Sequence, residues 1–102
     1  MTLVEESIMT TKVISVDEQT LKLVPHTCLD NDFKQAFTSR AKGSHRHVVD
    51  LASIKSLDSA ALGMLIMLKA HAKPGEKISL ENVPDPMKGF LDRNTLGKLF
   101  NY

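Results

Sequence analysis

Hydrophobic and polar residues follow one another in short blocks that predict strands alternating with helices. Two apolar runs around a polar turn, Val13–Val16 and Leu21–Val24, predict a β-hairpin that stops at Pro25, which has no N–H to donate. One of the three residues Asp30, Asn31 and Asp32 is then expected to cap a helix. The apolar face of that helix is formed by residues at helical spacing, Phe33, Ala36, Phe37 and Ala41. The helix is expected to end at Gly43.

The period of the pattern changes in the middle of the chain. Arg46–Leu51 predicts a strand, and its adjacent valines, Val48 and Val49, suggest cover on both faces. Small polar residues follow, and a second helix is expected from Asp58 or Ser59, both good caps, to about His71 or Ala72. Its expected buried face is formed by Leu62, Leu65 and Ile66. Met64 and Met67 either lie off that face or fill the core.

The last third of the chain repeats the order. Ile78 and Leu80 alternate with polar residues as in a strand, and Asp85 is a plausible cap ahead of Pro86 at the first helical position. A short helix with the apolar residues Met87, Phe90 and Leu91 follows, and a final apolar segment is expected to dock on the core through Leu96, Leu99 and Phe100.

This order predicts an α/β fold with a mixed β-sheet of four to five strands and helices packed against it, reached by right-handed crossovers. The 102 residues suit one domain, residues 1–102. Within it, residues 1–10 are expected to be a loose N-terminal segment or an edge strand.

Composition excludes several classes of function. Thirteen Lys and Arg against twelve Asp and Glu leave a net charge of +1, so no basic field favours nucleic acid. The apolar run Ala60–Leu68 is far shorter than the roughly 20 residues that cross a bilayer, so direct membrane insertion is not expected. The single Cys28 and the absence of a secretory leader fit a cytoplasmic protein.

Ser59 is the candidate for chemistry, and three roles for its hydroxyl remain open. The first is a plain helix cap, the commonest use of Asp-Ser ahead of an apolar helix. The second, a nucleophile, is disfavoured because Leu57 and Ala61 stand where a Gly-x-Ser-x-Gly elbow has its glycines. The third is a phosphoacceptor, since a phosphate at a helix N-terminus meets free N–H groups and the positive end of the helix dipole.

Other chemistry is not favoured by the sequence. His45 and His47 would point to one side of a strand, but a metal site needs further ligands. The spacing of His26 and His71 does not require either of them to supply one. We expect no metal, no cofactor and no catalytic residue. The reactivity of Cys28 depends on surroundings that the sequence does not define.

The stretch from Asp50 to Leu65, with Leu57-Asp58-Ser59 followed by Ala61-Leu62-Gly63-Met64-Leu65, resembles the core motif of the STAS domain, Asp-Ser-(Ser/Thr)-(Gly/Ala)-Leu-Gly. The likeness extends from about Val13 to Phe100 because the order of elements also agrees. It is greatest to the stand-alone bacterial anti-sigma factor antagonists. Two departures stand out: Ala60 replaces a frequent second hydroxyl, and the loop Pro25–Asp32 lacks the glycine that commonly follows the second strand.

The resemblance implies a partner-switching regulator that catalyses nothing itself. Ser59 matches the phosphoacceptor of the family. The free form would bind an anti-sigma factor or kinase-like regulator, whose kinase activity would phosphorylate Ser59 and separate the complex; a serine/threonine phosphatase would reset it. We expect the docking surface to comprise Ser56, Asp58, Ala60, Gly63 and Met64. The alternative is a constitutive STAS subunit of a transport-associated complex, with no phosphorylation cycle.

Overall fold

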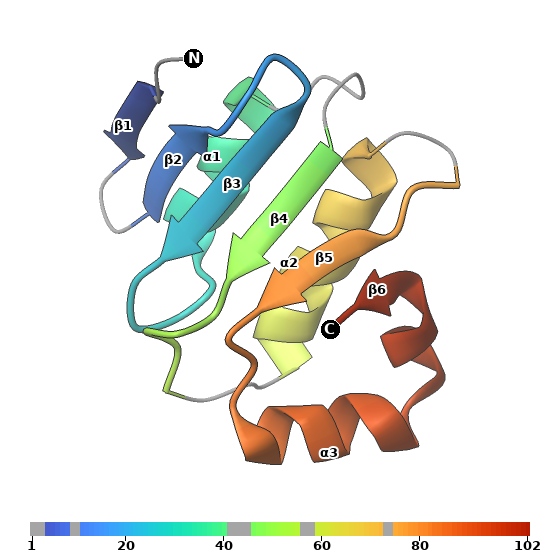
Figure 1. Cartoon of the computed structure of the whole chain (residues 1–102). Helices are drawn as coiled ribbons and strands as arrows, with labels where there is room; N and C mark the ends of the chain where they lie inside the picture. Colours follow the sequence, from blue (N-terminus) through green and yellow to red (C-terminus); the bar gives the residue numbers. More distant parts are fainter. Residues whose placement is uncertain (1–3, 9–10, 41–45, 56–58, 73–74) are drawn as a thin grey trace.

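The computed structural model describes residues 4–8, 11–40, 46–55, 59–72 and 75–102. These residues form a six-stranded sheet whose spatial order follows the sequence (Figure 1). The strands are β1 (Val4–Ile8), β2 (Thr11–Ser15), β3 (Thr20–Pro25), β4 (Arg46–Asp50), β5 (Ile78–Glu81) and β6 (Phe100–Asn101). The first three strands pair antiparallel, and β3 to β6 pair parallel.

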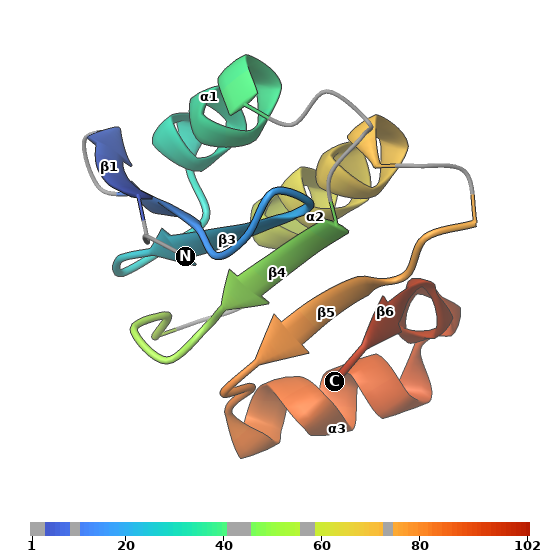
Figure 2. The ribbon, with the colours of Figure 1, turned by 45° about the horizontal axis from the view of Figure 1, so that its top comes forward.

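Each parallel connection passes through a helix. Helix α1 (Asn31–Arg40) joins β3 to β4, and α2 (Ser59–His71) joins β4 to β5. Helix α3 (Asp85–Arg93) and the 3-10 turn η1 (Thr95–Leu99) lead from β5 to β6. Helices α1 and α2 lie side by side against one face of the sheet, whereas α3 lies apart from them, below β5 and β6 in both views (Figures 1 and 2).

The core lies between the sheet and its helices. Alternate strand residues are buried there, which is the period-2 pattern of a sheet covered on one face. The first helix meets this surface with Phe33 and Phe37, whose rings pack edge to face at 5.4 Å between centroids. The predicted apolar face of α1 is confirmed, because Phe33, Ala36 and Phe37 are fully buried; Ala41 and Gly43 lie outside the described residues.

Several predictions about the elements are confirmed. The hairpin forms as β2 and β3, with Ile14 opposite Lys22. Asp30 is the residue that caps α1, since its Oδ1 accepts the N–H groups of Asp32 at 3.0 Å and Phe33 at 3.3 Å. Helix α2 starts at Ser59 and ends at His71, as expected. The α/β fold with a mixed sheet is confirmed as well.

Other expectations need correction. The sheet has six strands, one more than the upper number expected, because the chain end adds the two-residue β6. The N-terminal segment pairs as edge strand β1, which confirms one of the two alternatives expected for it. Val48 is only half-buried while Val49 is fully buried, so β4 is covered on one face only. Asp85 is the first residue of α3 and not its cap; Pro84 holds the cap position with extended backbone.

Candidate functional site

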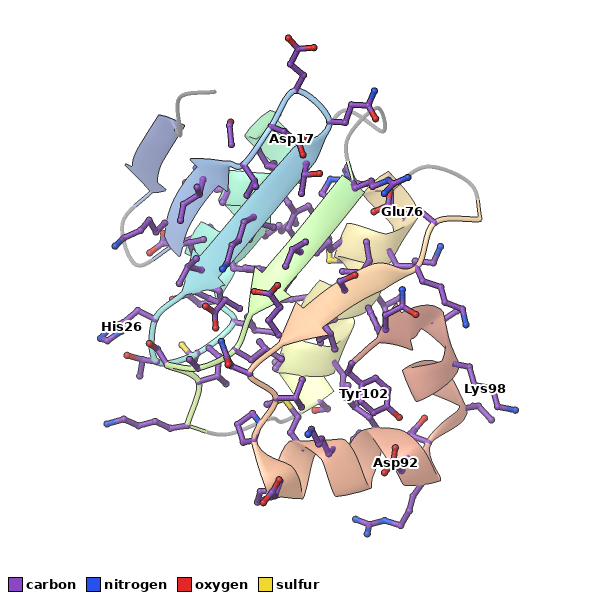
Figure 3. All side chains as sticks on the ribbon, viewed as in Figure 1. Asp17, His26, Glu76, Asp92, Lys98 and Tyr102 are labelled. Atoms are coloured by element: carbon purple, nitrogen blue, oxygen red, sulfur yellow. The ribbon has the colours of Figure 1, made fainter. Side chains whose placement is uncertain are left out.

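The candidate site lies at the edge of the sheet where the parallel strands β3, β4 and β5 end. Ligand and partner sites of parallel α/β sheets gather at this carboxyl edge because the connecting loops meet there. The loop after β4 leads into α2, and Ser59 is the first residue of that helix. The opposite, amino edge is marked by Asp17 and Glu76 at the top of Figure 3, with His26 of the carboxyl edge at the lower left.

Main-chain hydrogen bonds tie the loop after β4 to the loop after β3. The N–H of Thr27 donates to the carbonyl of Ser53 at 3.1 Å, and the N–H of Lys55 donates back to Thr27 at 3.3 Å. Thr27 pairs with Ile54 as an isolated parallel bridge. Residues 53–55 of the loop after β4 are therefore held against the loop after β3.

Thr27 adopts a left-handed backbone with φ of 75°. This conformation is uncommon for a residue other than glycine and costs most for a β-branched side chain. The loop Pro25–Asp32 contains no glycine, and a threonine takes the left-handed position in its turn. In this conformation, Thr27 forms its two main-chain hydrogen bonds to Ser53 and Lys55 of the loop after β4.

Asp50 braces the start of the same loop. Its Oδ1 accepts the N–H of Ala52 and the side-chain amide of Asn82, both at 3.0 Å, and Lys22 lies 3.8 Å from Oδ2. Partial burial raises the pKa of Asp50, but the hydrogen bonds from Asn82 and Ala52 and the charge of Lys22 together outweigh it. The pKa of Asp50 is therefore below its usual range, and the carboxylate is ionised at neutral pH.

Helix α2 has a different buried face from the one predicted. The residues it buries are Ala61, Leu65 and Leu68, while Leu62 is half-buried and Ile66 is 39% exposed. Of the three residues expected on the buried face, Leu65 is confirmed and Ile66 is wrong, because the helix is rotated so that Ala61 and Leu68 face the sheet beside Leu65. Met64 and Met67 are half-buried and pack against the core, so the core-filling alternative holds for both.

The outer face of α2 is a line of small and apolar residues that begins at Ser59. Ser59, Gly63, Ile66 and Ala70 follow one another at spacings of four, three and four residues, which places them on one side of a helix. Ser59, Ile66 and Ala70 are exposed and Gly63 is half-buried. We call these four residues the α2 outer stripe. Ala60, also exposed, lies beside it.

The structure describes only some of the residues that were predicted to form the docking surface. Ser59 and Ala60 are exposed at the start of α2, and Gly63 and Met64 are half-buried one turn later. Ser56 and Asp58 lie outside the described residues. A role for these residues in docking, and of Ser59 as phosphoacceptor, remains a prediction.

Sequence reasoning missed Ile66 because it assigned this residue to the core. A helix that is apolar on every side has no polar face to set the rotation of its buried side. The composition of the helix could have revealed its apolar outer face, because Ser59–Leu68 contains no charged residue although the helix lies on the surface of the sheet. A second apolar face on such a helix indicates a surface that contacts another protein.

The described histidines and Cys28 do not form a second site with Ser59. His47 is buried, and its Nδ1 lies 3.4 Å from Oε2 of Glu76. The Nδ1 of His71 lies 3.0 Å from the carbonyl oxygen of Met67. His71 lies at the opposite end of α2 from Ser59, roughly 18 Å along the axis. Cys28 is exposed, with its Sγ 3.7 Å from Asp30. Within the described ranges, no three His, Cys, Asp or Glu residues are grouped as metal ligands.

The described part of the chain contains no helix long and apolar enough to span a membrane.

Comparisons with known proteins agree with this fold. The sequence model of a family described as "Mlab, STAS domain" matches residues 13–100. A STAS-domain containing protein of Pseudomonas aeruginosa (strain UCBPP-PA14) is 41% identical over 71 residues, which cover 68% of this chain and 69% of that protein. The NMR structure of the protein TM1081 matches with a TM-score of 0.66 at 19% identity, over 84% of this chain and 74% of that one. At this identity the structural likeness concerns the fold alone.

Proposed function

The chain belongs to the STAS domain family, and from that premise we propose that it is an anti-sigma factor antagonist that acts by partner switching. Domains of this family are typically non-enzymatic and bind partner proteins. In the proposed cycle, the chain with free Ser59 binds an anti-sigma factor or kinase-like regulator and thereby releases the other client of that regulator. Phosphate on Ser59 then separates the complex.

The observation that carries the proposal is the α2 outer stripe. A surface helix normally turns charged and polar residues to water. Here the exposed Ile66 and Ala70 continue in line with the exposed hydroxyl of Ser59. An apolar surface that starts at a modifiable hydroxyl suits an interface whose affinity is set by the state of that hydroxyl.

The position of Ser59 also suits a phosphate. As first residue of a thirteen-residue helix, Ser59 lies beside backbone N–H groups that have no partner within the helix, and beside the positive end of the helix dipole. The fold can therefore hold the added charge, roughly −2 near neutral pH, without unfolding. The same charge placed at the end of an apolar stripe must be desolvated when a partner docks, which weakens binding.

The direct experiment is phosphorylation by the cognate kinase-like regulator with ATP, followed by mass spectrometry of the modified residue. The proposal predicts phosphate on Ser59, loss of the modification in Ser59→Ala, and its persistence in the control variant Thr95→Ala, whose hydroxyl is exposed on η1. A serine/threonine phosphatase of the same pathway is expected to remove it. Phosphate on another residue, or none with the regulator bound, would contradict the switch.

Binding measurements complete the test. Ser59→Ala is expected to bind the regulator as the unmodified chain does, and Ser59→Asp to bind at least about tenfold more weakly, which corresponds to roughly 1.4 kcal/mol. Equal, tight binding by both variants together with an unmodified Ser59 would favour a constitutive subunit of a transport-associated complex instead.

A further inference from the structure

A hollow of about 220 Å³ lies between the loop after β4 and helix α3. Ile54 and Met87 are its buried residues, and Phe90 is half-exposed at its side. Pro84 and Pro86 complete its apolar lining. We call this hollow the α3 groove. It lies at the same edge of the sheet as Ser59, because Ile54 belongs to the loop that leads into α2.

The only charged residues that line the α3 groove among the described residues are two cations, Lys55 and Arg93. Both are exposed, and neither forms an ion pair with a residue that the structure describes. The guanidinium of Arg93 lies back over the preceding turn of α3, with Nη1 3.6 Å from the position a Cβ would take at Gly89. This groove is therefore apolar inside and positively charged at its rim.

The acidic residues of α3 do not neutralise this rim. Asp85 and Asp92 belong to the helix but do not line the groove. Asp92 accepts a hydrogen bond of 2.6 Å from the hydroxyl of Tyr102 at the end of the chain (Figure 3). Among the residues that the structure describes, no acidic side chain therefore pairs with Lys55 or Arg93.

We propose that the α3 groove holds one apolar side chain of the protein partner, and that the residues flanking this side chain are acidic. The volume is below the roughly 300–1,000 Å³ of small-molecule sites, so it suits one side chain of a larger protein and not a cofactor. Half-exposed Phe90 and the guanidinium of Arg93 are of residue types that are enriched at protein–protein interfaces. The lysine and arginine at the rim select negatively charged neighbours.

This inference rests on the proposed function and adds the chemistry of the partner to it. Lys55 precedes Ser59 by four residues in one loop, so a phosphate on Ser59 adds negative charge to the same side of the molecule. An acidic partner segment is then repelled, and the cations of the rim gain a competing negative charge nearby. With an acidic partner, one phosphate on Ser59 therefore weakens binding at the α3 groove as well as at the α2 outer stripe.

The test is an NMR titration of the ¹⁵N-labelled full chain with the peptide acetyl-Glu-Asp-Glu-Phe-Asp-Glu-amide. We expect saturable shifts of the amides of Ile54, Lys55, Met87 and Phe90, with binding that weakens as salt is raised. A peptide with Lys in place of every acid, and one with Ser in place of Phe, are expected to leave these amides unshifted. Shifts elsewhere only, or equal shifts with the basic peptide, would overturn the inference.

Charge-reversal variants make the test specific. Lys55→Glu/Arg93→Glu is expected to weaken the acidic peptide roughly fivefold or more, whereas Lys12→Glu/Lys77→Glu, with the same change in net charge at two exposed lysines away from the groove, leaves it unchanged. Unchanged binding by the first variant overturns the inference. The spectra report whether each variant is folded.

The two proposals fail separately. A chain that is phosphorylated on Ser59 but does not bind the acidic peptide contradicts the groove and leaves the switch standing. Peptide binding in the groove by a chain that the kinase does not modify supports the groove and contradicts the switch.

Discussion

Helices α1 and α2 lie side by side on one face of the sheet, yet they turn different surfaces to water (Figure 2). On α1 the positions Asn31, Gln35 and Thr38 are exposed and all three are polar. On α2 the positions at the same spacing are Ser59, Gly63 and Ile66. Both helices bury large apolar residues toward the sheet, so the difference is confined to their outer faces.

The difference separates the inner helix faces, which stabilise the fold, from the outer face of α2, which we propose binds a partner. The outer face of α1 is typical of a surface helix, because its exposed polar side chains remain hydrated. The outer face of α2 exposes Ile66, which gains nothing for the isolated fold. The apolar outer surface of α2 is therefore the surface that we propose a partner contacts, whereas the exposed positions Asn31, Gln35 and Thr38 of α1 offer no apolar side chain.

The largest effects are expected on the inner faces, where the two helices are alike. Phe37→Ala on α1 and Leu65→Ala on α2 each remove a fully buried side chain. We expect each to lower the free energy of unfolding by roughly 3–5 kcal/mol, measured by urea denaturation. A loss below about 1 kcal/mol at either position would show that its helix does not pack on the sheet as described.

The outer faces are expected to differ in binding and not in stability. Ile66→Asp should weaken binding of the regulator at least about tenfold, because a charge is placed in the apolar stripe. Thr38→Asp, at the matching position of α1, should leave binding unchanged. Calorimetric titration of both variants measures this, and equal losses would remove the distinction between the helices.

The start of α1 depends on Asp30 as its cap. Asp30→Ala leaves the N–H groups of Asp32 and Phe33 without this acceptor, and we expect a loss of about 1 kcal/mol in unfolding free energy. Regulator binding should be unaffected, since α1 carries no part of the proposed surface. A binding defect in a stably folded Asp30→Ala chain would extend the interface to α1.

The start of the loop after β4 is held by Asp50, and this contribution to stability should vary with pH. The folded-state pKa of Asp50 is lowered, so its stabilisation is complete above the unfolded value of about 3.9 and is lost as the pH falls through the folded value. Asp50→Asn should therefore be less stable than the unmodified chain near pH 7. The gap should narrow as urea titrations are repeated from about pH 5 toward about pH 2. A gap that stays constant would show that the charge of Asp50 has no part in holding the loop.

Sequence patterns predicted most of this fold where polar and apolar residues separate cleanly. The hairpin β2–β3 and the buried face of α1 follow from alternation and from helical spacing. The pattern failed at α2, since apolar residues on all sides leave the rotation of the helix undetermined, and at β4, where two adjacent valines suggested cover that one face lacks. The short edge strand β6 has too few residues for any pattern.

The site was predictable only as a position along the chain. The change from strand to helix around Asp58-Ser59 placed the loop and the start of α2 correctly. The hydrogen bonds that hold this loop involve Asp50 at the end of β4, Asn82 after β5 and Thr27 after β3, so only the folded structure brings them together. The α3 groove likewise joins residues some thirty positions apart in sequence, Ile54 and Met87 among them.

One measurement tests the central claim most directly: the amide shifts of the ¹⁵N-labelled chain on binding its kinase-like regulator, before and after phosphorylation. We predict shifts along the α2 outer stripe, at Ser59, Gly63, Ile66 and Ala70, with none at Asn31, Gln35 and Thr38. Phosphate on Ser59 should abolish them at the same protein concentration. Shifts centred on α1, or a stripe that binds the regulator equally well with phosphorylated Ser59, would contradict the account.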